Sequence, residues 1–201
     1  MSAGRRLGIL GGAFDPPHMA HVALARAAIE QLHLDELRVF PTGLAWHKTR
    51  VISAGEHRLA MTRLAFADAP GVVVDDRELR RAGPTYTVDT LRELHAEHPH
   101  DTWVLVIGAD QADALDQWRE SDEIARLAII SIADRPRNDR PEGAFDASRV
   151  PGGQWIPLEL PLLPVSATDI RQRKAAGQAI DHLVPAAVAR YIDQHHLYLP
   201  T

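Results

Sequence analysis

Apolar residues along the chain fall into short β-branched runs separated by longer stretches with helical spacing. The short runs predict strands at Leu7 to Leu10, Leu37 to Pro41, Val72 to Val74, Trp103 to Ile107, Leu127 to Ile132 and Gln154 to Pro157. The stretches between them predict helices near His18 to Leu32, Ala54 to Ala69, Val88 to Glu97 and Ser121 to Ala125. Strands that alternate with crossover helices are typical of a parallel sheet. We therefore predict an α/β fold with a doubly wound, Rossmann-like parallel sheet.

Capping residues predict where two of these helices begin. Ser53 followed by Glu56 matches a capping box ahead of the second helix, and Ser121 is a suitable N-cap for the fourth. The segment Asp134 to Pro151 is rich in proline and charged residues, which predicts a surface loop.

The pattern changes after this loop. Two further helices are predicted over Ser166 to Ala175 and Pro185 to His195, with no strand between them. We therefore divide the chain into a Rossmann-like core over residues 1–160 and a small helical part over residues 161–201, which together form one continuous domain.

The composition limits the class of function. With 201 residues, of which 45% are hydrophobic and 24% charged, the chain is long enough to bury a full core. It has neither an apolar run of about 18 residues nor a secretory leader pattern, so we expect no membrane span and a cytoplasmic location. The absence of cysteine excludes disulfides, thiolate nucleophiles and cysteine-bound zinc.

The charge balance bears on the possible partners. The formal net charge is −5, whereas binding to long nucleic acid depends on a basic surface. We therefore expect no binding to long nucleic acid, and any anion site must be local. The sequence leaves a homo-oligomer open.

The most informative segment follows the first predicted strand. It reads Gly11-Gly12-Ala13-Phe14-Asp15-Pro16-Pro17-His18, and His21 follows within the next helix. Paired glycines at the carboxyl end of a parallel strand let backbone N–H groups approach phosphate oxygens closely. His18 and His21 share one helix face near the positive end of the helix dipole, where both rings can donate to developing negative charge. The structural alternative is a tight turn with capping histidines, and a zinc site would lack a third ligand.

This segment resembles the G-G-[ST]-F-D-P-x-H-x-G-H signature of the nucleotidyltransferase superfamily. Ala13 stands where the family has Ser or Thr, and Ala20 where it has Gly. The resemblance implies an ATP site at Gly11, Gly12, Ala13, Phe14, His18 and His21.

A second anion motif lies near the C-terminus, in Val165-Ser166-Ala167-Thr168-Asp169-Ile170-Arg171. Ser166 at an N-cap, Thr168 and the free N–H groups of the first turn can hold phosphate oxygens, and Arg171 can grip them bidentately. A plain capping motif is the alternative. The segment resembles the I-S-S-T-x-I-R signature of the same superfamily, with Ala167 in place of the middle Ser, and this likeness implies an ATP-phosphate site at Ser166, Thr168 and Arg171.

The middle of the chain is similar to one branch of the superfamily, the bacterial nicotinate mononucleotide adenylyltransferases. The matching segments are Pro41 to Lys48, Gly83 to Leu91, Val106 to Gln111, Leu115 to Trp118 and Ser131 to Pro136. The resemblance implies nucleotide contacts from Gly108, Asp110 and Arg135, and a mobile phosphate clamp at Lys48. For nicotinate mononucleotide it implies Asp15, Lys48, Thr85, Tyr86, Thr87 and Trp118.

Elementary chemistry supports parts of that second site. Thr85 and Thr87 flank a predicted helix start, where free N–H groups suit a carboxylate. The indole of Trp118 can stack on an electron-poor pyridinium ring. Each residue also has a structural alternative, namely a helix cap for the threonines and a core position for the tryptophan.

The resemblance as a whole implies transfer of the adenylyl group of ATP to nicotinate mononucleotide. We expect His18, His21, Lys48 and Arg171 to act in catalysis, with Mg²⁺ carried in by ATP and no metal site in the protein itself. A phosphate monoester is largely dianionic at pH 7, so no general base is needed. Three alternatives remain: a pantetheine-phosphate adenylyltransferase, a cytidylyltransferase, and a nucleotide-binding regulator without activity. The preference for nicotinate over nicotinamide also stays open.

Overall fold

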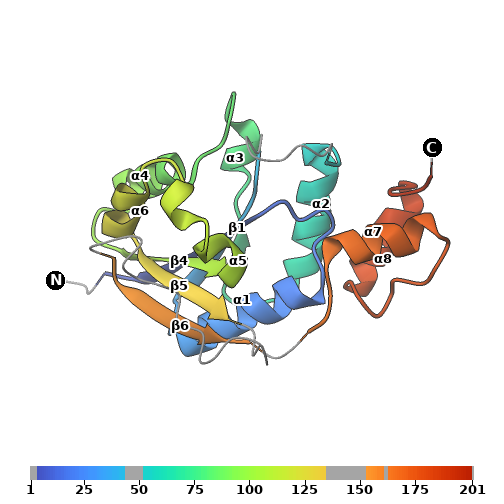
Figure 1. Ribbon diagram of the computed structural model, residues 1–201, viewed down its shortest axis with the longest axis horizontal. Coiled ribbons are helices and arrows are strands. Elements are labelled where there is room, and N and C mark those ends of the chain that lie inside the picture. Colours follow the sequence, from blue (N-terminus) through green and yellow to red (C-terminus); the bar gives the residue numbers. More distant parts are fainter. Residues whose placement is uncertain (1–3, 44–51, 135–152, 161–162, 201) are drawn as a thin grey trace.

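The computed structural model of the chain describes residues 4–43, 52–134, 153–160 and 163–200. Its centre is a six-stranded sheet in the order β3-β2-β1-β4-β5-β6, in which every neighbouring pair is parallel (Figure 1). The strands are β1 (Arg6–Gly12), β2 (Glu36–Pro41), β3 (Val72–Val74), β4 (Thr102–Gly108), β5 (Ile129–Asp134) and β6 (Trp155–Glu159). This is the doubly wound order, with its switch point between β1 and β4. The predicted fold class is confirmed.

Helices cover both faces of the sheet (Figure 1). They are α1 (Met19–Gln31), α2 (Gly55–Phe66), α3 (Arg77–Arg80), α4 (Thr87–Glu97), α5 (Ala109–Ala112), the 3₁₀ helix η1 (Leu115–Gln117), α6 (Ser121–Leu127), α7 (Ala167–Ala175) and α8 (Ala186–Gln194). The apolar runs of the central strands are nearly continuous because each face of the sheet packs against helices.

Alternation along the strands divides the interior into two cores. In β4, Val104 and Val106 join the core beneath α1 and α2, whereas Trp103, Leu105 and Ile107 join the core beneath α4 and α6. Successive strand residues point to opposite faces, so one strand supplies both cores. The rigid layer thus formed carries the turns at its carboxyl edge.

Both predicted helix caps are wrong. The N-cap of α2 is Ala54, which makes no side-chain cap hydrogen bond, and Ser53 instead uses its backbone groups to contact other segments. The N-cap of α6 is Glu120, in a left-handed conformation (φ 54°), and Ser121 is the first helical residue. In both places tertiary contacts override the local capping signal, since Glu120 is held by Arg92 of α4.

Several boundaries also differ from the pattern. Leu127 ends α6, and β5 begins only at Ile129 and runs to Asp134. The short helices α3, α5 and η1 were not predicted, because three or four residues carry too little periodicity. Most of the predicted loop from Asp134 to Pro151 lies outside the described residues.

The C-terminal helices pack beside α1 and α2, on the right of Figure 1. Ile170, Val184 and Val188 belong to the same core as Leu10 and Phe14. The helical part therefore shares its interior with the sheet, and α7 lies close to the turn that follows β1. In the part of the chain that the structure describes, no helix is long and apolar enough to cross a membrane.

Candidate active site

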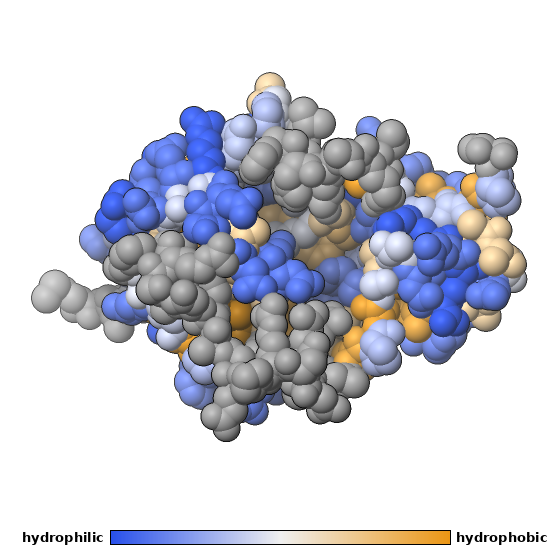
Figure 2. All heavy atoms as spheres, in the orientation of Figure 1, coloured by the Kyte–Doolittle hydropathy of each residue, from blue (hydrophilic) through white to orange (hydrophobic). Residues whose placement is uncertain are grey.

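A cavity of about 360 Å³ opens at the carboxyl edge of the sheet, between β1, β4 and the starts of α4 and α5. Figure 2 shows a hollow on this face, with hydrophilic surfaces on either side and hydrophobic side chains visible inside it. Ligands of doubly wound sheets bind at this edge, near the switch point. The lining includes many residues expected from the sequence: Gly11, Gly12, Ala13, Thr85, Tyr86, Thr87, Asp110 and Trp118.

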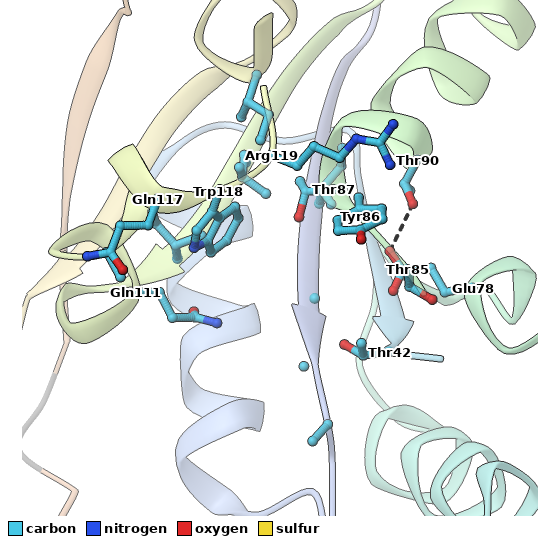
Figure 3. Close-up of a pocket in the computed structure, with 18 of the residues that line it drawn as sticks. Thr42, Glu78, Thr85, Tyr86, Thr87, Thr90, Gln111, Gln117, Trp118 and Arg119 are labelled. Atoms are coloured by element: carbon cyan, nitrogen blue, oxygen red, sulfur yellow. Dashed lines mark hydrogen bonds between the residues drawn. The ribbon is translucent and has the colours of Figure 1, made fainter. Parts of the chain in front are cut away.

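Two walls of the cavity face each other across β1, as Figure 3 shows. One wall is the start of α4, where Tyr86 is the N-cap and Thr87 the first helical residue, and the first turn of a helix leaves backbone N–H groups without intrahelical partners. The other wall is Trp118, which follows η1 and is half-buried against the core beneath α4 and α6. The cavity thus offers an aromatic face opposite a set of hydrogen-bond donors.

Other lining residues were not predicted as site residues, although four of the six lie in segments that resemble the family. They are Thr42, Glu78, Thr90, Gln111, Gln117 and Arg119. The guanidinium carbon of Arg119 lies 4.7 Å from the centroid of the Tyr86 ring, a cation–π contact at the cavity rim (Figure 3). The one indication in the sequence that Arg119 lies at this site is its position directly after Trp118.

Glu78 is a buried acid in the cavity wall, with 7% of its surface exposed. Its Oε1 accepts a hydrogen bond from the Thr90 hydroxyl at 2.9 Å, and Arg81 donates to the same hydroxyl oxygen at 3.1 Å. Burial raises the pKa of Glu78 to about 7, against the opposing effects of the Thr90 hydrogen bond and the Arg81 charge. The charge of this wall therefore changes near neutral pH.

The turn after β1 brings both histidines together. His18 is the N-cap of α1, and its backbone N–H donates to Nδ1 of His21 at 3.1 Å. The two rings stack with their centroids 3.7 Å apart, and the edge of Phe14 packs on His21 at 4.9 Å. Phe14 itself has a left-handed backbone (φ 48°), which turns the chain sharply at the strand end.

The second anion motif meets this turn directly. Arg171 donates from Nη1 to the backbone carbonyl of Asp15 at 2.7 Å and from Nη2 to Thr168 Oγ1 at 3.0 Å, although Arg171 and Asp15 are 156 residues apart in the chain. The predicted N-cap at Ser166 is confirmed, because its Oγ accepts the N–H of Asp169 at 3.1 Å. The fold therefore brings the two predicted anion-binding segments into contact.

Asp15 lies in the interior beneath the turn. Its side chain is 2% exposed, Oδ1 accepts from the hydroxyl of Tyr198 at 2.8 Å, and Oδ2 accepts from the Ser53 N–H at 3.4 Å. These contacts direct the carboxylate toward protein groups. Tyr198 and Ser53 are partners that no local pattern of the sequence indicated.

Two expected residues lie outside the part of the chain that the structure describes, and two others lie where β4 meets α5. Lys48 and Arg135 fall in ranges that the structure does not describe. Gly108 ends β4 as the N-cap of α5, its N–H donates to Gln111 Oε1 at 3.3 Å, and Asp110 is exposed in the first turn. In the described ranges, no group of three or more His, Cys, Asp or Glu side chains is arranged to hold a metal ion.

Comparison with known proteins places the chain in a family. The cytidylyltransferase-like family model matches residues 9–173. A protein of Albidiferax ferrireducens, named probable nicotinate-nucleotide adenylyltransferase, is 54% identical over 96% of this chain and 98% of its own length. The chain belongs to the nicotinate-nucleotide adenylyltransferases. A Methylibium petroleiphilum protein of the same name is 42% identical to this chain, over 98% of this chain and 93% of its own length.

A solved structure shares the fold of this chain. Plasmodium falciparum nicotinic acid mononucleotide adenylyltransferase complexed with NaAD superposes with a TM-score of 0.79 and 21% identity, over 96% of this chain and 97% of that chain. The likeness extends to the C-terminal helices as well as the sheet. The two proteins therefore share one fold over nearly their whole lengths.

Proposed function

We propose that the adenylyl transfer of the family takes place where the cavity meets the turn after β1. The reaction joins the adenylyl group of ATP to nicotinate mononucleotide and yields nicotinate adenine dinucleotide and pyrophosphate, a step of NAD biosynthesis. The observation that carries the proposal is the contact of Arg171 with the Asp15 carbonyl, because it places the second anion motif beside the glycine turn. Two phosphate-binding segments next to one aromatic cavity suit a reaction between two nucleotides.

The nicotinate nucleotide would occupy the cavity. Its pyridinium ring would stack on Trp118, and its carboxylate would accept hydrogen bonds from backbone N–H groups at the start of α4, around Thr85, Tyr86 and Thr87. The guanidinium of Arg119 above Tyr86 adds a positive charge at the rim. Asp15, which the family resemblance also implies for this nucleotide, would act from beneath the turn, since its carboxylate is buried.

The phosphates of ATP would lie along the turn. Backbone N–H groups of Gly11, Gly12 and Ala13, with Phe14 shaping the turn, would approach the oxygens, and His18 and His21 would donate from one side. Ser166, Thr168 and Arg171 would hold the phosphates from α7. Gly108 and Asp110 would meet the ribose, and Lys48 and Arg135 stay predictions as a phosphate clamp and a nucleotide contact.

The chemical step needs alignment more than a base. A phosphate oxygen of nicotinate mononucleotide attacks the α-phosphorus of ATP, the new P–O bond forms, and the bond to the bridging oxygen breaks to release pyrophosphate. The attacking phosphate is already largely dianionic at pH 7. The residues around the turn therefore contribute by holding both nucleotides in line and by stabilising charge on the leaving group.

Mg²⁺ is expected to enter with ATP. The groups around the turn are mostly donors, namely backbone N–H, imidazole and guanidinium, and these suit phosphate oxygens. The oxygen ligands that Mg²⁺ prefers would come from ATP and water, and the exposed carboxylate of Asp110 would be a further oxygen ligand. The ion would supply neutralisation of the phosphate charge.

The experiment that tests this proposal is pyrophosphate release with ATP and Mg²⁺ and three acceptors in parallel. We expect strong preference for nicotinate mononucleotide over nicotinamide mononucleotide and phosphopantetheine. Release with another acceptor would overturn the assignment of the cavity, and ATP binding without release would favour a regulator. Homo-oligomer formation and a cytoplasmic location stay predictions.

A further inference from the structure

A buried cluster beneath the turn connects segments that are distant in the sequence. Asp15 accepts from Tyr198, which is 183 residues away, from Ser53, which is 38 residues away, and through its backbone carbonyl from Arg171. One residue therefore ties the phosphate turn to the chain's C-terminal segment, to the start of α2 and to α7.

Arg58 of α2 completes the cluster from below. It is 3% exposed, and its Nη1 donates to the carbonyls of Ala13 at 2.9 Å and Thr42 at 2.8 Å, while Nε donates to the carbonyl of Ser53 at 3.0 Å. Burial lowers the pKa of Arg58, and the negative charge of Asp15 opposes that shift. The guanidinium thus fixes the carbonyl side of the turn at Ala13, and Asp15 balances its charge.

Tyr198 supplies the remaining donor from the far end of the chain. Burial and the neighbouring Asp15 charge both raise the pKa of its phenol, so the hydroxyl stays protonated and donates at any working pH. A buried carboxylate that loses a donor pays a desolvation cost and relaxes toward other partners. Any such relaxation of Asp15 shifts the turn on both sides of it, which are Ala13 and Phe14 before it and the residues that lead to His18 after it.

We propose that Tyr198 is a positioning residue for adenylyl transfer, which acts by holding the buried carboxylate of Asp15 and thereby the phosphate turn from Ala13 to His18. The inference rests on the proposed function, since it assigns ATP's phosphates to that turn. In-line transfer is sensitive to geometry, and a displacement of about 1 Å costs on the order of a hundredfold in rate. Loss of the Tyr198 hydroxyl therefore lowers the rate of the chemical step, whereas Trp118 and the start of α4, on the other walls of the cavity, keep their positions.

The test compares Tyr198→Phe with a matched control, Tyr191→Phe. The Tyr191 hydroxyl lies 3.0 Å from Nδ1 of His57, so the control also removes one hydroxyl contact between α2 and the C-terminal region, away from the turn. We expect Tyr198→Phe to lower kcat about tenfold or more, with a smaller change in KM for nicotinate mononucleotide, because Trp118 and the start of α4 stay in place. Tyr191→Phe should leave kcat within about twofold. Rates are measured at a temperature where circular dichroism shows every variant folded.

A double variant separates positioning from general loosening. If Tyr198 acts through Asp15, the double variant Asp15→Asn/Tyr198→Phe has a kcat no lower than that of the less active of the two single variants. Multiplied losses, an unchanged kcat in Tyr198→Phe, or equal kcat losses in both tyrosine variants would overturn the proposal. A wild-type enzyme that does not use nicotinate mononucleotide would instead contradict the proposed function, so the two failures are distinguishable.

Discussion

The backbone N–H of His18 donates to Nδ1 of His21 at 3.1 Å, so the Nδ1 atom of His21 is an acceptor. In a neutral imidazole with Nδ1 as acceptor, the proton resides on Nε2. The ring of His21 is therefore held as an Nε2–H donor, with His18 stacked against it at 3.7 Å. This arrangement suits donation to phosphate oxygens rather than abstraction of a proton.

His18→Ala should reduce turnover strongly. Removal of one preorganised donor to a developing oxyanion typically costs roughly 10² to 10³ in kcat. We expect a loss in or beyond that range, measured as pyrophosphate release under saturating substrates, with an unchanged circular dichroism spectrum. His100→Ala, at an exposed position, serves as the control and should retain full activity. Turnover at the wild-type level in His18→Ala would remove His18 from the catalytic group.

Trp118→Ala should weaken binding of the pyridine nucleotide selectively. Loss of the stacking face is expected to raise KM for nicotinate mononucleotide about tenfold, with a smaller effect on KM for ATP. Trp118→Phe keeps an aromatic face and should recover most of the loss. Equal increases in both KM values would contradict the stacking role.

Arg171→Ala should lower kcat and raise KM for ATP, because it removes both the contact with the Asp15 carbonyl and a cation for phosphate. We expect a loss of kcat of about a hundredfold. Arg173 lies on the same helix and pairs with Asp169 at 2.8 Å at the surface, so Arg173→Ala is the matched control and should change kcat little. Similar losses in both variants would indicate damage to α7 as a whole.

Glu78 should make stability depend on pH. Its pKa rises on folding from the ordinary value of 4.5 to about 7, so the folded protein holds this proton more tightly than the unfolded chain. The free energy of unfolding therefore falls as pH rises through this window, and the full cost of up to about 3 kcal/mol is present above pH 7. Burial is the main cause of the raised pKa of Glu78, Asp75 and Glu93 also raise it, and the Thr90 hydrogen bond and the Arg81 charge lower it.

Glu78→Gln provides the measurement. Urea unfolding of the wild type and the variant at pH 5 and pH 8 should show the wild type losing stability relative to the variant at the higher pH. In the same range the ratio of the wild-type KM to the variant KM for nicotinate mononucleotide should rise, because ionised Glu78 repels the anionic substrate and the titration of the substrate phosphate is common to both proteins. Parallel pH profiles of the two proteins would show that Glu78 does not titrate near neutrality.

Sequence pattern located most of the fold and part of the site. The strands of the central sheet are nearly continuous apolar runs because both faces are covered, and such runs are visible without a structure. Predicted helix starts were wrong where contacts with other parts of the structure set the boundary. Ala54 is the N-cap of α2, because the backbone of Ser53 bonds to Asp15 and Arg58. Glu120, which pairs with Arg92, is the N-cap of α6.

The sequence by itself determined the parallel α/β architecture, the glycine turn with its two histidines, and the second anion motif around Ser166. The architecture follows from the alternation of strand and helix patterns along the chain, and each of the two motifs depends on residues within one turn or helix start. Only the tertiary structure decided that Arg171 reaches Asp15, that Glu78 and Arg119 line the cavity, and that Tyr198 supports the turn. Contacts between residues far apart in the chain depend on how the layers pack, and burial, which sets the pKa of Glu78, exists only once those layers have closed.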